Sequence, residues 1–240
     1  MVVTTEIVDA PMRMLVTAPC AEGRYPGILL YSDIFQITGS QRRLSTRLAG
    51  YGFVVATPEI YNRLESAGTA FEFDDAGRSR GLANAQKTAA ADFDADGHAV
   101  LRWLAADPRV DEKRLGAMGF CIGGHLAFRA ALQPAVRGAV CFYPTGLHDG
   151  KLGKDPDAGS LARAREVRGE LLLVFGTADP HVPDGARASI AAALTAAGAK
   201  FATKLFPAEH AFMRDEGPRY DPEATDRAWD EAIAFLRRAL

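Results

Sequence analysis

The sequence predicts an α/β protein, with a mostly parallel central sheet of about seven to eight strands and helices on both faces. Short apolar runs rich in branched residues recur along the chain, and longer stretches with helical spacing separate them. This alternation is typical of parallel sheets, because each parallel connection crosses over through a helix. Neither a repeat nor a linker divides the chain, so we expect one domain over residues 1–240.

Seven apolar runs are predicted to be strands: residues 12–16, 27–31, 53–57, 115–118, 139–143, 171–175 and 202–206. Four residues that could do chemistry follow such runs directly, namely Asp33, Glu59, Cys121 and Asp179. In an open α/β sheet, ligands bind beyond the carboxyl ends of the strands. We therefore expect the functional site at that end of the sheet.

Helices are predicted between and after these strands, at residues 41–49, 92–105, 123–132, 185–197 and around Trp229, Ala232, Ile233 and Leu236. Asp184 is expected to cap the fourth of these helices, and Gly198 to end it. Residues 64–91 and 148–169 are polar and dotted with glycine, and they receive no assignment. Long loops in compact domains often border a site, so we expect both segments near it.

Composition argues against several classes of protein. The net charge of -2 shows no basic excess for binding nucleic acid, and no apolar run is long enough to span a bilayer. The three cysteines, Cys20, Cys121 and Cys141, are too few and too far apart for a disulfide framework or a paired metal site. We expect a cytoplasmic protein, because the N-terminal residues lack a basic region followed by an apolar core, and a monomer, because no long apolar helix stripe or exposed hydrophobic run calls for a partner. We expect no metal and no cofactor, because no metal-ligand spacing or phosphate-binding glycine loop occurs.

The stretch RLGAMGFCIGGHLAF contains the spacing G-x-C-x-G around Cys121, which is the cysteine form of the nucleophile elbow. The elbow is a strand-to-helix turn so sharp that larger side chains at Gly119 and Gly123 would collide with neighbouring backbone. It places Cys121 at a helix N-terminus, where a thiolate is favoured. The expected donors to an oxyanion are the backbone N–H groups of Ile122 and of a residue near Ile34.

Two partners for Cys121 follow in the order nucleophile, acid, base that such hydrolases use. Asp179 lies in FGTADPHVP, past the sixth predicted strand, and His210 lies in LFPAEHAFMR, past the seventh. Taken alone, Asp179 could be a turn residue and His210 a surface histidine. Three placements in one order favour a triad of Cys121, His210 and Asp179. His181, beside the acid, is a further candidate for contact with substrate.

The sequence resembles the dienelactone hydrolase family, the carboxymethylenebutenolidases of the α/β-hydrolase fold. The resemblance extends from GILLYSDIFQ through GFVVATPEIYNR and the cysteine turn to LLLVFGTADPHVP and LFPAEHAFMR. It implies the α/β-hydrolase fold and hydrolysis of a small ester or lactone through a thioester, with an anionic substrate in the family members that open dienelactone. Cys121 would attack, His210 would shuttle protons and Asp179 would orient the imidazole.

The resemblance also implies three further site positions. Family members carry a glutamate after the second strand that engages the thiol, and Asp33 is found at the matching place. Two arginines would hold a substrate carboxylate, and Arg214 matches one of them. The second would come from FDDAGRSRGLANAQK, where Arg78, Arg80 and Lys87 all stay open.

Three alternatives to a dienelactone hydrolase remain. The first is a broader esterase or lactonase, which the shorter Asp33 and the unplaced second arginine favour. The second is a hydrolase scaffold that binds a small ligand without turnover. The third is a redox-responsive protein that uses Cys121, although no resolving cysteine lies near it in the sequence.

Overall fold

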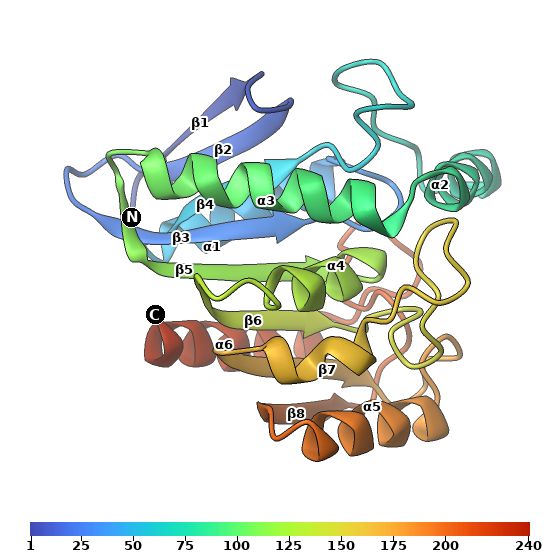
Figure 1. Cartoon of the computed structure of the whole chain (residues 1–240). Helices are drawn as coiled ribbons and strands as arrows, with labels where there is room; N and C mark the ends of the chain where they lie inside the picture. Colours follow the sequence, from blue (N-terminus) through green and yellow to red (C-terminus); the bar gives the residue numbers. More distant parts are fainter.

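A computed structural model describes residues 1–240 and shows one sheet of eight strands (Figure 1). In chain order the strands are β1 (Val3–Val8), β2 (Met14–Pro19), β3 (Tyr25–Tyr31), β4 (Val54–Pro58), β5 (Val110–Phe120), β6 (Val136–Phe142), β7 (Glu170–Gly176) and β8 (Lys200–Phe206). Across the sheet the order is β1-β2-β4-β3-β5-β6-β7-β8, and only the pairs that contain β2 are antiparallel. The predicted α/β class with a mostly parallel sheet is confirmed.

Helices cover both faces of the sheet, as predicted (Figure 1). One face carries α1 (Gly39–Gly50) and α6 (Pro222–Ala239), and the other carries α3 (Ala90–Ala106), α4 (Ile122–Ala130), α5 (Asp184–Ala196) and the 3-10 helix η1 (Leu161–Glu166). Each face has its own apolar core, the larger one beneath α3, α4 and α5. None of the helices has the length and apolar character needed to cross a membrane.

Three elements were not predicted, and one of them is η1, inside the unassigned segment 148–169. The other two are a strand and a helix. The first is β1, an edge strand whose VTTEIV sequence is mostly exposed and so carries no apolar run. The second is α2 (Asp75–Lys87), inside the unassigned segment 64–91. Its sequence holds two glycines and few apolar residues, so its periodicity is weak, although the Asp74 side chain caps it by accepting from the Gly77 N–H.

One predicted cap is wrong. The N-cap of α5 is Pro183, and Asp184 is the first residue inside the helix. The Asp184 carboxylate binds the Arg187 side chain within the helix instead of a backbone N–H of the first turn. The seven predicted strands all overlap observed ones.

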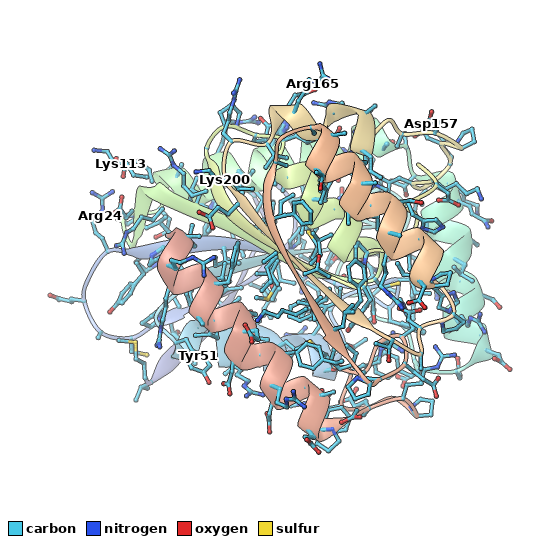
Figure 2. The ribbon with its side chains drawn as sticks, turned by 90° about the horizontal axis from the view of Figure 1, so that it is seen from below. Arg24, Tyr51, Lys113, Asp157, Arg165 and Lys200 are labelled. Atoms are coloured by element: carbon cyan, nitrogen blue, oxygen red, sulfur yellow. The ribbon has the colours of Figure 1, made fainter.

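The parallel strands place their carboxyl ends at one end of the molecule, together with α2 and the long connection after β6 (Figure 1). Both chain termini lie at the opposite end. Figure 2, a view from below, shows Arg24 and Lys113 at the amino ends of the strands and Asp157 toward the other end. The loops that follow β3, β5, β6, β7 and β8 therefore converge, which is the arrangement expected to form a ligand site.

Candidate active site

Cys121 occupies the sharp turn between β5 and α4, with φ 58° and ψ -121°. A non-glycine residue rarely adopts this left-handed region, so the conformation is strained. The flanking glycines make the turn possible: a Cβ at Gly119 would collide with the Gly123 carbonyl, and one at Gly123 with the Ser32 carbonyl. The structure thus has the turn that the glycine spacing predicts, and it leaves the Cys121 side chain partly exposed.

Asp179 and His210 come together from the loops after β7 and β8. Asp179 Oδ2 lies 2.7 Å from His210 Nδ1, and both side chains are almost completely buried. The other carboxylate oxygen accepts the backbone N–H groups of His181 at 2.7 Å and Val182 at 3.3 Å. These bonds hold the carboxylate in one orientation and so direct the imidazole toward Cys121.

The three groups shift one another's pKa values. Burial favours the neutral thiol of Cys121, but the His210 imidazole beside it reverses this effect and lowers the pKa of Cys121. Burial likewise opposes the charged form of His210, and the Cys121 thiolate and Asp179 carboxylate outweigh burial and raise the pKa of His210 to about 9. Burial would raise the pKa of Asp179, yet the bond to His210 lowers it. The arrangement therefore favours a thiolate and imidazolium pair.

The two residues expected to supply oxyanion donors both line the cavity above Cys121. Ile122 is the first residue of α4, so its backbone N–H has no acceptor within the helix. Ile34 lies in the loop after β3, and α2 packs against this loop so closely that a Cβ at Gly81 would collide with the Ile34 carbonyl. Helix α2 therefore supports the loop that contains Ile34, the expected second donor.

Asp33 and Arg214, predicted separately, form one ion pair. Arg214 donates to Asp33 Oδ2 from Nε at 3.0 Å and from Nη2 at 2.6 Å, while Asp33 Oδ1 accepts the Phe35 N–H at 2.9 Å. The guanidinium also lies 4.7 Å from the ring centres of both Phe35 and Phe73. Both Asp33 oxygens are thus occupied, although the carboxylate is near enough to oppose the drop in the pKa of Cys121.

The structure separates the three candidates for the second basic residue. Arg78 lines the cavity, and none of its nitrogens lies within ion-pair distance of a carboxylate. Arg80 points elsewhere, since it pairs with Glu65 and lies over the Phe71 ring. Lys87, the last residue of α2, is not among the residues that line the cavity, whereas Lys151 of the loop after β6 is.

The cavity has a volume of about 450 Å³, enough for a small organic molecule. Six apolar side chains form much of its wall: Ile34, Phe35, Phe73, Leu82, Ala85 and Leu152. His181 also faces it, edge-on to His210 with ring centres 4.7 Å apart. No group of three or more His, Cys, Asp or Glu side chains is arranged to hold a metal ion.

Residues near the thiol that sequence reasoning missed come from the end of β6. The Thr145 hydroxyl lies 3.6 Å from Cys121 Sγ, and the Tyr143 ring meets the His210 imidazole edge-on. The rule that ligands bind past the carboxyl ends of parallel strands could have pointed to this loop. The same rule singled out Glu59, which instead binds Arg13 and the Gly68 N–H and is buried away from the cavity.

Residues 12–240 match the family described as "Dienelactone hydrolase family". A Saccharomyces cerevisiae relative named "Putative carboxymethylenebutenolidase" is 38% identical over 213 residues, which covers 85% of this chain and 78% of the relative. "Carboxymethylenebutenolidase" of Pseudomonas sp. (strain P51) is 30% identical over 221 residues, covering 91% of this chain and 87% of that protein.

Among solved structures, the protein described as "Putative Dienelactone Hydrolase" from Klebsiella pneumoniae subsp. pneumoniae superimposes with a TM-score of 0.83 at 24% identity. The match covers 99% of this chain and 98% of that one, so the two share a fold from end to end. The sheet order and the turn at Cys121 agree with the α/β-hydrolase fold that the sequence predicts. This chain belongs to the dienelactone hydrolase family, and it is a hydrolase that acts on esters or lactones.

Proposed function

We propose that the enzyme cleaves its substrate through a thioester on Cys121, with His210 and Asp179 completing the triad. The observation that carries this proposal is the chain of contacts at the base of the cavity. The strained turn exposes the sulfur, the imidazole is close enough to raise the thiolate fraction, and Asp179 Oδ2 lies 2.7 Å from His210 Nδ1. A nucleophile, its base and an orienting acid in this relation support nucleophilic catalysis.

The reaction then takes two steps. Cys121 Sγ attacks the carbonyl carbon, the resulting oxyanion accepts hydrogen bonds from the Ile122 and Ile34 N–H groups, and His210 gives its proton to the departing alkoxide. The bond to the alcohol oxygen breaks and a thioester forms. Water next attacks the thioester and loses a proton to His210, and the acid leaves as the thiolate returns. Asp179 keeps the same imidazole face toward the sulfur throughout.

For the substrate, we propose a small lactone or ester that carries a carboxylate. Arg78 supports this choice, because it is a cation on the cavity wall without a carboxylate partner. Arg214 would contribute its remaining Nη1, and Asp33 would act by holding its guanidinium against the paired Phe35 and Phe73 rings. The name of the Pseudomonas relative, a carboxymethylenebutenolidase, agrees with an anionic lactone.

A second candidate is a general esterase for neutral substrates. The apolar wall favours it, as does the ion pair that already occupies two nitrogens of Arg214. Asp74 and Asp75 also line the cavity, and their carboxylates would repel a substrate that carries a negative charge. The two candidates share the chemistry at Cys121 and differ in whether Arg78 and the remaining Nη1 of Arg214 bind a substrate carboxylate.

The chemistry is tested by comparing kcat/KM of the wild type with Cys121→Ala and Cys121→Ser, on an anionic dienelactone and on a neutral p-nitrophenyl ester. We expect the alanine variant to lose activity on both, and mass spectrometry of quenched wild type to show an acyl group on Cys121. Serine is the matched control for the shape of the turn. An alanine variant that folds and retains the wild-type rate contradicts the proposal.

The substrate class is tested with Arg78→Ala. Arg80→Ala is the matched control, because Arg80 lies in the same helix and does not line the cavity. Arg78→Ala should raise KM for the anionic lactone about tenfold and leave the neutral ester unchanged, because one charged hydrogen bond to the ligand is lost. Arg80→Ala should change neither. Equal effects of Arg78→Ala on both substrates would favour the general esterase.

A further inference from the structure

We propose that Thr145 is a further catalytic residue, whose hydroxyl donates a hydrogen bond to the Cys121 thiolate and is held in place by a buried relay through His125. The inference rests on the proposed function, in which Cys121 is the nucleophile. Its evidence is the set of contacts that joins the sulfur to α3, through the loop after β6 and helix α4.

Thr145 contacts Cys121 through two hydrogen bonds. Its hydroxyl lies 3.6 Å from Cys121 Sγ, which is within hydrogen-bond distance for sulfur, and its backbone N–H donates to the Cys121 carbonyl at 3.3 Å. A thiolate has no proton to give, so in that state the hydroxyl must be the donor. Thr145 also lines the cavity, which places its hydroxyl beside the reacting atom.

The Thr145 carbonyl is fixed by His125 of α4, whose Nδ1 lies 3.1 Å away. A carbonyl only accepts, so Nδ1 carries the hydrogen. In a neutral imidazole Nε2 is then an acceptor, and the Ser160 hydroxyl, 2.6 Å away, must donate to it. Burial, reinforced by the nearby Arg129 cation, lowers the pKa of His125 to about 3, in agreement with the neutral ring.

The relay ends on a buried charge. Arg129 Nη1 donates to Ser160 Oγ at 2.8 Å and to the Ala158 carbonyl at 2.9 Å, and its other nitrogens bind Asp94 of α3 at 2.7 and 2.6 Å. His125, Ser160 and Arg129 are 0%, 1% and 6% exposed. Each assigned donor has an acceptor, and a satisfied buried network of this kind allows only one arrangement. It therefore sets the position of Thr145 relative to the sulfur.

Several other groups face the thiol and limit what Thr145 can contribute. His210 favours the thiolate and Asp33 opposes it, while burial keeps the phenols of Tyr61 and Tyr143 protonated by raising their pKa. Thr145 is the neutral hydroxyl whose bond to Cys121 favours the charged form. That bond is made to the thiolate and lost in the thioester, so it assists the sulfur as a leaving group when water releases the acid.

The test compares Thr145→Val, which has the same shape without the hydroxyl, with Thr145→Ser, which keeps it. The pKa of Cys121 is measured from the pH dependence of iodoacetamide alkylation at Cys121, followed by peptide mass spectrometry because Cys20 is also exposed, with thermal melting to show that each variant folds. Thr145→Val should raise this pKa by about one unit, the loss of one hydrogen bond to a charged group, and lower kcat. Thr145→Ser should stay close to the wild type.

Ser160→Ala tests the relay without touching Thr145, and Ser45→Ala is its matched control. Ser45 is also buried and bonds Thr17 Oγ1 at 3.0 Å, but it lies in α1 on the other face of the sheet. We expect Ser160→Ala to raise the pKa of Cys121 by a fraction of the Thr145→Val shift, and Ser45→Ala to leave it unchanged.

A folded Thr145→Val enzyme with an unshifted Cys121 pKa would overturn the role of the hydroxyl. If that variant does not fold, a Ser160→Ala enzyme whose thiol pKa equals that of Ser45→Ala overturns it instead. Turnover that survives in Cys121→Ala is a separate result. It would contradict the proposed function, whereas the hydrogen bond from Thr145 to the sulfur is tested in enzymes that keep Cys121.

Discussion

Two buried histidines lie near Cys121 and have opposite properties. His210, in the loop after β8, is 5% exposed and has its pKa raised to about 9. His125, in the first turns of α4, is 0% exposed and has its pKa lowered to about 3. Burial acts on both in the same direction, against the charged ring. Burial alone therefore does not decide what a histidine does.

The partners of each ring explain the difference. His210 lies between two acidic groups, the Asp179 carboxylate and the Cys121 thiol, and both favour a proton on the imidazole. His125 is hydrogen-bonded to a carbonyl and a hydroxyl, and the Arg129 cation opposes a proton on its ring. One ring can move protons near neutral pH, whereas the other stays neutral and works as a fixed connector.

The largest effect that this comparison predicts is that of His210→Ala. Removing the ring that we propose to transfer protons should lower kcat/KM by about 10⁴-fold with little change in melting temperature, because general acid–base catalysis would be lost. The matched control is His98→Ala in α3, a histidine that does not line the cavity. A loss that is shared by both variants would show that the effect is not specific to the site.

A smaller effect is expected for Asp179→Asn, about 10³-fold in kcat/KM, because general acid–base catalysis by His210 would be weakened but not removed. The amide keeps the shape of the carboxylate but removes the charge that raises the pKa of His210, and its NH₂ group can select the wrong tautomer. The pH–rate profile should shift, since His210 would then lose its proton at lower pH. An unchanged profile in a folded variant would contradict the assignment of Asp179 as the orienting acid.

The smallest effect concerns His125→Gln and is measured as stability. In the wild type the folded pKa lies below the ordinary value of 6.5, so His125 stabilises the fold fully above pH 6.5 and progressively less as pH falls toward 3. Denaturant unfolding should show the variant about 2 kcal/mol less stable at neutral pH, because two buried partners lose their bonds. Below pH 6.5 this gap should shrink by up to ~1.4 kcal/mol per pH unit.

The carboxylates that also cause acid unfolding are the same in the wild type and in His125→Gln. Their contributions therefore cancel in the difference between the two free energies of unfolding. A gap that stays constant from pH 7 to pH 4 would mean that His125 is protonated at its ordinary pKa. The neutral tautomer on which the Thr145 relay depends would then be wrong.

Sequence reasoning succeeded where local chemistry is strong. The apolar runs located seven strands, and the glycines around Cys121 indicated the turn that the structure has. It failed at α2, whose glycines and polar residues mask its periodicity, although that helix supplies Arg78 and supports the Ile34 loop. It also misplaced the cap of α5, because proline and aspartate are adjacent there and either can begin a helix.

The sequence by itself determined seven of the eight strands, five of the six α-helices, the strained turn and the three groups of the proposed triad, because each depends on residues close together or on their order in the chain. Only the tertiary structure decided which arginine faces the cavity, that Asp33 pairs with Arg214, and that Thr145 reaches the sulfur. These contacts join residues far apart in the chain. Their partners are chosen by how the loops pack at the carboxyl ends of the strands, and no local pattern encodes that packing.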